Sequence, residues 1–417
     1  MNKILLKEIV NVIAGQSPES IYYNNNGDGM PFLQGNRTFG RLYPFIDTWT
    51  NKITKRANAG DILISVRAPV GDLNISNQEI CIGRGIAALA PKNVSNRFVF
   101  YCLKYNLKTL LSSSSGTTFS SVNRSDLENL ELVVPEKKNW EQIIKILSAL
   151  DDKIEVNNKI NAELEAMAKT LYDYWFVQFD FPNEDSKPYK SSGGKMVYNK
   201  TLKREIPEGW EVTVFNDWIK QTKTGDWGKE NIVGNYTARV YCVRGADING
   251  LNGKGEVKAP ERFILQNNLS KKLEPNDFII EISGGSPTQS TARIALLTKE
   301  SFDRFDTDVV CSNFCKAVTL KDEAFAFNFQ QEWQRLYDAG VFFGFEGKTS
   351  GIKNFLFESF MESYHIVKPN KDLVLRYSSI AKELEKKKQS NLKQNQELAQ
   401  LRDWLLPMLM NGQISVE

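Results

Sequence analysis

Arginine, lysine, asparagine and glutamine residues recur in two sets of loops beside short, strand-like runs. Their side chains donate hydrogen bonds to base edges and phosphate oxygens, which is the chemistry of nucleic-acid contact. The first set is Gln34, Asn36, Arg37, Arg41, Lys52, Lys55, Arg56, Arg67 and Arg84. The second set is Lys223, Arg239, Arg244, Lys254, Lys258, Arg262, Arg293, Lys348 and Lys353. Any one of these residues is more often a solvated surface charge, so the prediction of two nucleic-acid-binding surfaces rests on the sets as wholes.

Motifs for catalysis are missing from the sequence. The run from Gly344 to Thr349 resembles the end of a phosphate-binding loop, but Phe342 stands where that loop needs its first glycine. The run from Gly83 to Ala88 fits G-x-G-x-x-A, yet it continues as an apolar strand rather than a helix. There is no N/D-P-P-Y motif of adenine methyltransferases and no nuclease set of carboxylates and lysine. We therefore expect a non-catalytic chain that holds no cofactor of its own.

Histidine and cysteine usage points the same way. The single histidine, His365, excludes a multi-histidine metal site, and it sits in an apolar run that predicts a strand. The five cysteines form no CxxC pair, so we expect reduced thiols and no metal site.

Length and composition predict a globular protein of two or three domains. The chain has 417 residues, of which 41% are hydrophobic and 25% charged, and its net charge is only +3. That charge is too small to prove a nucleic-acid partner by itself. The N-terminal apolar run shows no cleavage site and no span near the length of a membrane helix, so we expect a cytoplasmic location without membrane contact.

Two long segments with a helical apolar rhythm organise the chain. The first, near 139–175, places Leu147, Ile154 and Leu164 on one seam, and a second copy lies near the C-terminus. A shift of 234 residues brings Leu150 onto Leu384, which reveals an internal repeat. The spacing of the second segment predicts a seam through Ile380, Leu384, Lys387, Asn391, Gln394, Leu398, Leu401 and Leu405. We expect the two helices to pack on each other, with a register fixed by polar seam residues: Asn157, Asn161, Asn391 and Asn395.

The order of the other features also repeats. PFLQGNRTFG is echoed by VYCVRGADING, AGDILISVRAP by PNDFIIEISGG, and EICIGRGIAALA by VVCSNFCKAVTL. The predicted fold class is α+β: two similar globular domains separated by two long helices packed as an antiparallel coiled coil, with a pseudo-two-fold internal repeat. The predicted boundaries are 1–137 and 210–371 for the globular domains, 138–181 and 372–417 for the helical regions, and 182–209 for a linker.

An aromatic cluster follows the first long helix and has two interpretations. Its members are Tyr172, Tyr174, Trp175, Phe176 and Phe179. An exposed cluster would bind a partner protein, whereas a buried one would cap the end of the helical pair within the chain.

The ordered set of features resembles the DNA-specificity subunits of type I restriction-modification systems. The resemblance covers nearly the whole chain and rests on the duplication, on LYDYWFVQFDFP, IPEGWEV and LRDWLLPMLMNGQI, and on the domain end SGTTFSSVNRSDLENLELVVP. It implies two target-recognition domains that each read one half of a split site in double-stranded DNA. It also implies helices that set the spacing and dock two modification subunits, which would carry S-adenosylmethionine, with restriction subunits as further partners.

Two other classes of function stay open from the sequence. One is a non-enzymatic helical scaffold or regulator with two protein-binding modules, which the weak net charge favours. The other is a self-contained DNA-modifying enzyme, which requires a cofactor motif that this sequence lacks.

Overall fold

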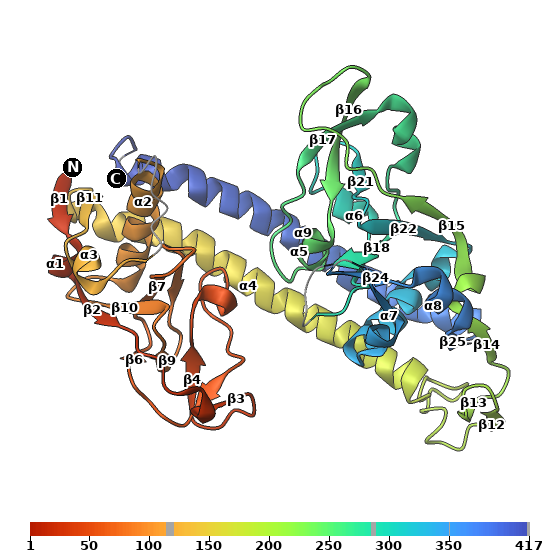
Figure 1. The fold of residues 1–417 in the computed structure, drawn as a ribbon. Coiled ribbons are helices and arrows are strands. Elements are labelled where there is room, and N and C mark those ends of the chain that lie inside the picture. The colour runs from red at the N-terminus through yellow and green to blue at the C-terminus, as the bar shows by residue number, and fades with distance from the viewer. Residues whose placement is uncertain (114–120, 285–288, 350, 415–417) are drawn as a thin grey trace. The chain divides into compact units, whose positions relative to one another are not determined.

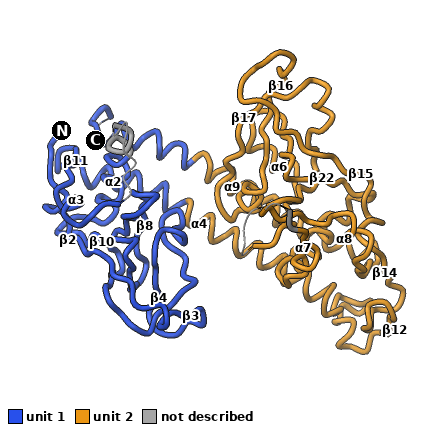
Figure 2. The backbone as a smooth tube through the Cα atoms, viewed as in Figure 1, with its two compact units in different colours: residues 1–153, 398–417 blue, residues 154–397 orange. Residues whose placement is uncertain are grey.

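The computed structural model describes residues 1–113, 121–284, 289–349 and 351–414 (Figure 1). The chain forms two compact units, drawn in two colours in Figure 2. Unit 1 comprises Met1–Lys153 with Leu398–Glu417, and unit 2 comprises Ile154–Glu397. The two long helices, α4 (Trp140–Tyr172) and α9 (Lys371–Met410), each contribute one part to unit 1 and the other part to unit 2.

Unit 1 is built on a four-stranded antiparallel sheet in the order β2-β10-β7-β8. Its strands are β1 (Asn2–Leu5), β2 (Val10–Ala14), β3 (Tyr23–Asn24), β4 (Met30–Leu33), β5 (Trp49–Thr50), β6 (Arg56–Ala57), β7 (Ile62–Ser65), β8 (Leu73–Ile75), β9 (Ile80–Ile82), β10 (Ile86–Pro91) and β11 (Glu131–Val134). Its shorter helices are α1 (Leu6–Ile9), α2 (Asn96–Ser113) and α3 (Arg124–Glu128). A second sheet runs β3-β5-β4-β9-β6, and β1 pairs with β11.

Unit 2 repeats this plan with additional elements. Its strands are β12 (Met196–Asn199), β13 (Arg204–Pro207), β14 (Glu211–Val214), β15 (Ile219–Thr224), β16 (Tyr236–Val243), β17 (Glu261–Leu265), β18 (Phe278–Glu281), β19 (Ser283–Gly284), β20 (Ile294–Leu296), β21 (Val309–Cys311), β22 (Cys315–Leu320), β23 (Glu346–Thr349), β24 (Ile352–Phe355) and β25 (His365–Lys368). Its shorter helices are α5 (Gly245–Leu251), α6 (Lys299–Phe302), α7 (Ala326–Asp338) and α8 (Phe357–Ser363).

The sheet orders confirm the internal repeat. The sheet β15-β22-β18-β20 corresponds strand by strand to β2-β10-β7-β8, and the pair β14-β25 corresponds to β1-β11. The parallel pair β16-β21 likewise corresponds to the parallel pair β4-β9. The stretch expected to be a linker, 182–209, contains the hairpin β12-β13. Of the domain end SGTTFSSVNRSDLENLELVVP, residues 115–120 lie outside the described residues, and α3 is capped by Asn123, whose side chain accepts from the backbone N–H of Asp126 at 3.0 Å.

Each unit has its own apolar core. In unit 1, Leu89 of the main sheet packs with Val99 of α2, Leu147 of α4 and Leu406 of α9. In unit 2 the core is rich in aromatic rings, and the indole of Trp333 lies fully buried and donates to the carbonyl of Ala292 at 2.8 Å. Both parts of the long helices therefore belong to the cores of the units that they enter, which fixes their orientation within each unit.

Within unit 2, the end of α4 packs antiparallel against the start of α9. The amide of Asn157 donates to Asn395 at 2.9 Å, and the amide of Asn391 donates to Asn161 at 2.9 Å. The shift of 234 residues relates Asn157 to Asn391 and Asn161 to Asn395, so each asparagine contacts the repeat partner of the other. Such reciprocal contacts are the signature of a two-fold relation between the helices. The four asparagines expected to set register thus lie together, and all four are buried.

The seam expected on α9 is partly wrong. Ile380 and Leu401 are 44% and 43% exposed. Ala381 and Arg402, one position further along, are buried instead. The heptad rule assumes that one neighbouring helix decides which residues are covered, whereas α9 also packs against the globular part of each unit.

Candidate nucleic-acid interface

The candidate site lies at the ends of two parallel strands and is built in both units. In unit 1, Leu33 of β4 pairs with Ile82 of β9. In unit 2, Val243 of β16 pairs with Cys311 of β21 in the same manner. Because the strands of each pair are parallel, the residues that follow them meet at one edge of the sheet. We call these two places the strand-end sites.

Backbone hydrogen bonds fix the equivalence of the two strand-end sites. The N–H of Gly83 donates to the carbonyl of Leu33 at 2.8 Å, and the N–H of Ser312 donates to that of Val243 at 2.8 Å. The strand ends are also joined by a third segment, since Gln16 donates to Ile82 at 2.9 Å and Asp226 donates to Cys311 at 2.8 Å. It follows that Gln34 corresponds to Arg244, Arg84 to Asn313, Ser17 to Trp227 and Gly85 to Phe314.

The strand-end site of unit 1 presents Gln34 and Arg84. The hydroxyl of Ser17 donates to Oε1 of Gln34 at 2.9 Å and accepts from the backbone N–H of Arg84 at 3.1 Å. Gly83 allows this packing, because a Cβ there would lie 2.8 Å from Oε1 of Gln34. Burial raises the pKa of Tyr23, which keeps its hydroxyl protonated as a donor beside the site. The Gln34 amide is thus oriented through its oxygen.

Arg84 is exposed at the tip of this turn. Over the described ranges of the chain, no carboxylate forms an ion pair with its guanidinium. A guanidinium without a carboxylate neighbour can pair in a bidentate way with phosphate or with a guanine edge.

The strand-end site of unit 2 presents Arg244 and Asn313. The guanidinium of Arg244 pairs with Asp247 through contacts of 2.9 and 3.1 Å, and it also donates to the carbonyl of Lys258 at 2.7 Å. The hydrogen bond to Asp247 raises the pKa of Arg244, and the carboxylate holds the side chain in one orientation. Asn313 is exposed at the turn. It was not among the expected DNA-binding residues, although aligning the repeat residue by residue would have placed it opposite Arg84.

Several other expected DNA-binding cations lie on the surface in ion pairs. The pairs are Arg37–Asp47 at 2.7 Å, Lys52–Glu19 at 3.1 Å, Arg56–Glu79 at 3.4 Å, Arg239–Glu261 at 2.7 Å, Lys254–Glu165 at 2.8 Å and Lys258–Glu256 at 3.4 Å. Exposed pairs of this kind contribute little to stability, so phosphate groups can replace the carboxylates. Asn36 donates to Asp72, and Lys55 and Arg67 are exposed. The side chain of Lys348 lies outside the described residues.

The remaining expected cations are part of the folded interior. Their pairs are Arg41–Asp151 at 3.2 Å, Lys223–Asp277 at 3.0 Å, Arg262–Glu230 at 3.1 Å, Arg293–Glu281 at 2.7 Å and Lys353–Glu346 at 3.1 Å. In each pair the cation is largely buried, and in four of the five the carboxylate is buried with it. Removing either member of such a pair would leave a buried charge unpaired, so these side chains hold the fold.

The aromatic cluster after α4 is not exposed as a whole. Tyr172, Trp175, Phe176 and Phe179 are between 3% and 6% exposed. Trp175 and Phe176 pack their rings near Tyr377 of α9, with centroids 6.3 and 5.3 Å away. The expectation of an exposed cluster is therefore wrong for these four residues, because the start of α9 covers the first three and Trp210 packs on Phe179 with ring centroids 5.5 Å apart. Tyr174 alone is exposed, at 37%.

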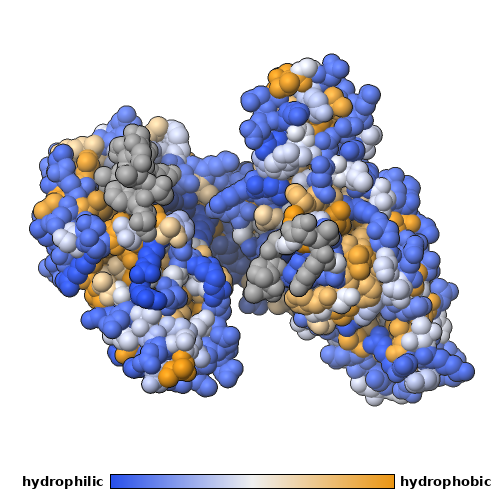
Figure 3. All heavy atoms as spheres, in the orientation of Figure 1, coloured by the Kyte–Doolittle hydropathy of each residue, from blue (hydrophilic) through white to orange (hydrophobic). Residues whose placement is uncertain are grey.

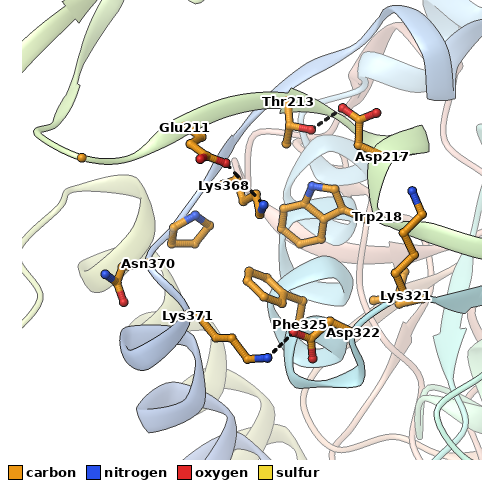
Figure 4. A pocket seen from close by; sticks show the side chains of 13 residues that line it. Glu211, Thr213, Asp217, Trp218, Lys321, Asp322, Phe325, Lys368, Asn370 and Lys371 are labelled. Atoms are coloured by element: carbon orange, nitrogen blue, oxygen red, sulfur yellow. Dashed lines mark hydrogen bonds and ion pairs between the residues drawn. The ribbon is translucent and has the colours of Figure 1, made fainter.

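A separate hollow of about 400 Å³ lies in unit 2, beside the start of α9 (Figure 4). Its walls carry both signs of charge, with Lys368 paired to Glu211 at 3.3 Å and Lys371 paired to Asp322 at 2.6 Å. Figure 4 shows Trp218 and Phe325 between these pairs. The paired charges give no preference for a phosphate backbone, so we do not assign this hollow to DNA.

Other kinds of site were sought in the described part of the chain. No group of three or more His, Cys, Asp and Glu side chains there could hold a metal ion. The five cysteines are free and buried. None of the helices in those residues is both long and apolar enough to span a membrane.

Known proteins resemble part of this chain or nearly the whole of it. The family model described as the type I restriction modification DNA specificity domain matches residues 1–166. The MjaX type I restriction enzyme specificity subunit of Methanocaldococcus jannaschii is 42% identical over 162 residues, which are 38% of this chain and 38% of the relative. The MjaIX specificity subunit of the same organism is 26% identical over 99% of this chain and 93% of the relative.

A solved structure resembles nearly the whole fold. The type I restriction-modification S subunit from M. genitalium matches with a TM-score of 0.55 and 15% sequence identity, over 98% of this chain and 96% of that one. This likeness supports the architecture of two domains and two long helices. Residues 1–166 therefore match the type I restriction modification DNA specificity domain, and the chain along nearly its whole length is similar to a specificity subunit of a type I restriction enzyme.

Proposed function

We propose that this chain is the non-catalytic subunit that recognises double-stranded DNA for a type I restriction-modification complex. The observation that best supports this proposal is that both units build a strand-end site on the same pattern of backbone hydrogen bonds. The side chains that the two sites present differ: they are Gln34 and Arg84 in unit 1, and Arg244 and Asn313 in unit 2. A duplicated frame with changed side chains is suited to reading two different half-sites of a bipartite target. Each of these four side chains is of a type that reads base edges.

The long helices would set the distance between the half-sites and dock the modification subunits. The helices are long, with 33 residues in α4 and 40 residues in α9. We propose two modification subunits as partners, with S-adenosylmethionine bound to them and restriction subunits joining for cleavage. We also propose a cytoplasmic location for the complex, which the similarity to subunits of restriction enzymes supports.

The first prediction concerns the base-reading side chains. Replacing Arg84 by alanine should relax the preference at one or two positions of a single half-site, and Asn313→Ala should do so in the other half-site. A bidentate contact to a base provides about 1–3 kcal/mol of discrimination, so we expect roughly 5- to 150-fold loss at the affected position. The measurement is sequencing of methylated sites in a randomised DNA library, using the complex of this chain with its modification subunits.

Arg124→Ala is the matched control for Arg84→Ala. Arg124 is an exposed arginine of unit 1 that pairs with Glu128 within α3, away from the strand end. The variant Arg124→Ala should leave the recognised DNA sequence unchanged. If Arg84→Ala altered both half-sites, or neither, the assignment of one half-site to each unit would be wrong.

Salt dependence separates this proposal from a scaffold function. A DNA-recognition subunit that neutralises phosphates loses affinity steeply as salt rises, because bound counterions are released. A helical scaffold with protein-binding modules would show no specific DNA complex at any salt concentration. Binding of a labelled target duplex between low and physiological salt therefore decides between the two.

A further inference from the structure

An open apolar hollow of about 580 Å³ adjoins the strand-end site of unit 2. Three large apolar side chains line it and remain exposed: Trp227 at 38%, Phe314 at 55% and Ile352 at 43%. Arg244 and Asn313 line it as well. Figure 3 shows apolar residues gathered on the visible face of unit 2 around β18 and β24, the strand that carries Ile352. Contiguous exposed apolar surface of this kind marks a binding site on a water-soluble protein.

The wall formed by Trp227 is held in place before any ligand binds. The guanidinium of Arg262 stacks on the indole at 4.3 Å from its ring. Arg262 itself is largely buried and pairs with Glu230 at 3.1 Å. A tryptophan fixed in this manner loses little conformational freedom on binding, so its apolar area is available for contact.

Two of the three apolar side chains of the hollow are specific to unit 2. At the equivalent positions of unit 1, Trp227 is replaced by Ser17 and Phe314 by Gly85. A Cβ on Gly85 would lie 2.6 Å from the carbonyl oxygen of Gln34, so unit 1 cannot carry a side chain there without moving its backbone. The backbone arrangement that the two strand-end sites share folds without these apolar groups. Their presence in unit 2 therefore indicates that they serve the half-site that unit 2 reads.

Only one of the four standard bases offers an apolar group in the major groove, and that base is thymine with its C5 methyl. Aromatic side chains are among the groups that contact this methyl. On the basis of the proposed DNA-recognition function, we propose that the hollow formed by Trp227, Phe314 and Ile352 receives the methyl edge of a thymine in the half-site of unit 2. The rim residues Arg244 and Asn313 then contact the neighbouring polar base edges.

The concave shape favours this ligand over two others. An apolar side chain that wedges between base pairs must project from the surface. Here the aromatic groups line a hollow, which suits a group entering from the DNA. A partner protein is the other candidate, but the hollow is continuous with Asn313, the counterpart of Arg84, and therefore belongs to the same edge as the polar site.

Replacing thymine by deoxyuridine tests the proposal, since this change deletes only the methyl group. In the complete complex, each thymine of the half-site assigned to unit 2 is replaced in turn, on either strand. One replacement should weaken binding by about four-fold or more, as expected for the loss of a buried methyl contact. The same replacements in the other half-site remove methyl groups that do not enter this hollow. Their effect on binding should therefore be the same for the wild-type chain and for Phe314→Ala.

The variant Phe314→Ala should bind the thymine duplex more weakly and should no longer distinguish it from the deoxyuridine duplex. Phe343→Ala is the matched control, because Phe343 is a similarly exposed phenylalanine of unit 2, at 51%, that lies outside the hollow. It should keep the discrimination.

The proposal is overturned if the half-site contains no thymine, if every deoxyuridine duplex binds like its parent, or if Phe314→Ala keeps the discrimination. Kinking of the duplex that disappears with Phe314→Ala, without methyl sensitivity, would identify a wedge instead. Loss of a modification subunit from the Phe314→Ala complex would identify a protein interface. Failure of the wild-type complex to bind any duplex would instead refute the proposed function itself.

Discussion

Adding one heptad to each long helix is expected to lengthen the spacer of the DNA target by about three base pairs. The insertions go between Asn157 and Asn161 in α4 and between Asn391 and Asn395 in α9. Seven residues at 1.5 Å per residue extend a helix by about 10 Å, which is close to three base-pair steps of a duplex with a turn of about 34 Å. Sequencing the methylated sites of the extended complex gives the new spacer directly.

The insertions must be made in both helices because the asparagines pair reciprocally. Asn157 pairs with Asn395 and Asn161 with Asn391. Insertions of equal length between the two asparagines of each helix therefore preserve both pairs. A heptad also keeps the phase of the seam. On the side of α9, the exposed hydrogen bond from Gln396 to the carbonyl of Arg304 is the contact that the insertion interrupts, and its loss should be small.

An insertion of four residues in the same two places is the control. It shifts the seam out of phase, so it should weaken the helical pair rather than produce a shorter extension. If the complex with two added heptads still methylated the original target with its original spacer, the helices would not set the spacing.

Replacing Asp151 by alanine is expected to cost about 3–5 kcal/mol of stability in unit 1, as for other buried ion pairs that lose one member. Asp151 of α4 accepts from Arg402 of α9 at 2.7 Å and from the hydroxyl of Tyr101 in α2 at 2.6 Å. The side chains of Asp151 and Arg402 are only 3% and 8% exposed, so the arginine would lose its buried carboxylate and keep only Asp403, at 2.7 Å, which is 44% exposed. Urea denaturation followed by the circular dichroism of the helices measures the change.

Two comparisons test the reason for this loss. The double variant Asp151→Leu with Arg402→Met removes both charges of this pair and should recover part of the stability, because apolar groups can replace a buried pair, whereas Arg41 and the Tyr101 hydroxyl still lose their contacts with Asp151. Glu131→Ala breaks the exposed pair with Lys3 and should change stability by about 1 kcal/mol or less. A single Asp151→Ala variant as stable as the parent would show that the buried pair does not hold the helices together.

The sequence by itself determined the repeat and the pairing of its helices. A shift of 234 residues aligns Asn157 with Asn391, and the structure then brings each of these asparagines onto the counterpart of the other. The order of the short strands was also readable, because strands that recur in the same order with the same flanking loops build the same sheets. These features are local or periodic, so they can be recognised in a single sequence.

Only the tertiary structure decided which charged and aromatic residues are available for binding. Lys223 and Arg293 look like loop cations in the sequence, but Asp277, just before β18, and Glu281, at the end of β18, hold them in buried ion pairs. Trp175 looks like an exposed anchor until Tyr377, about two hundred positions away in the chain, covers it. Partners supplied by distant segments leave no local pattern, and for this reason the burial of these side chains could not be predicted from their own neighbourhoods.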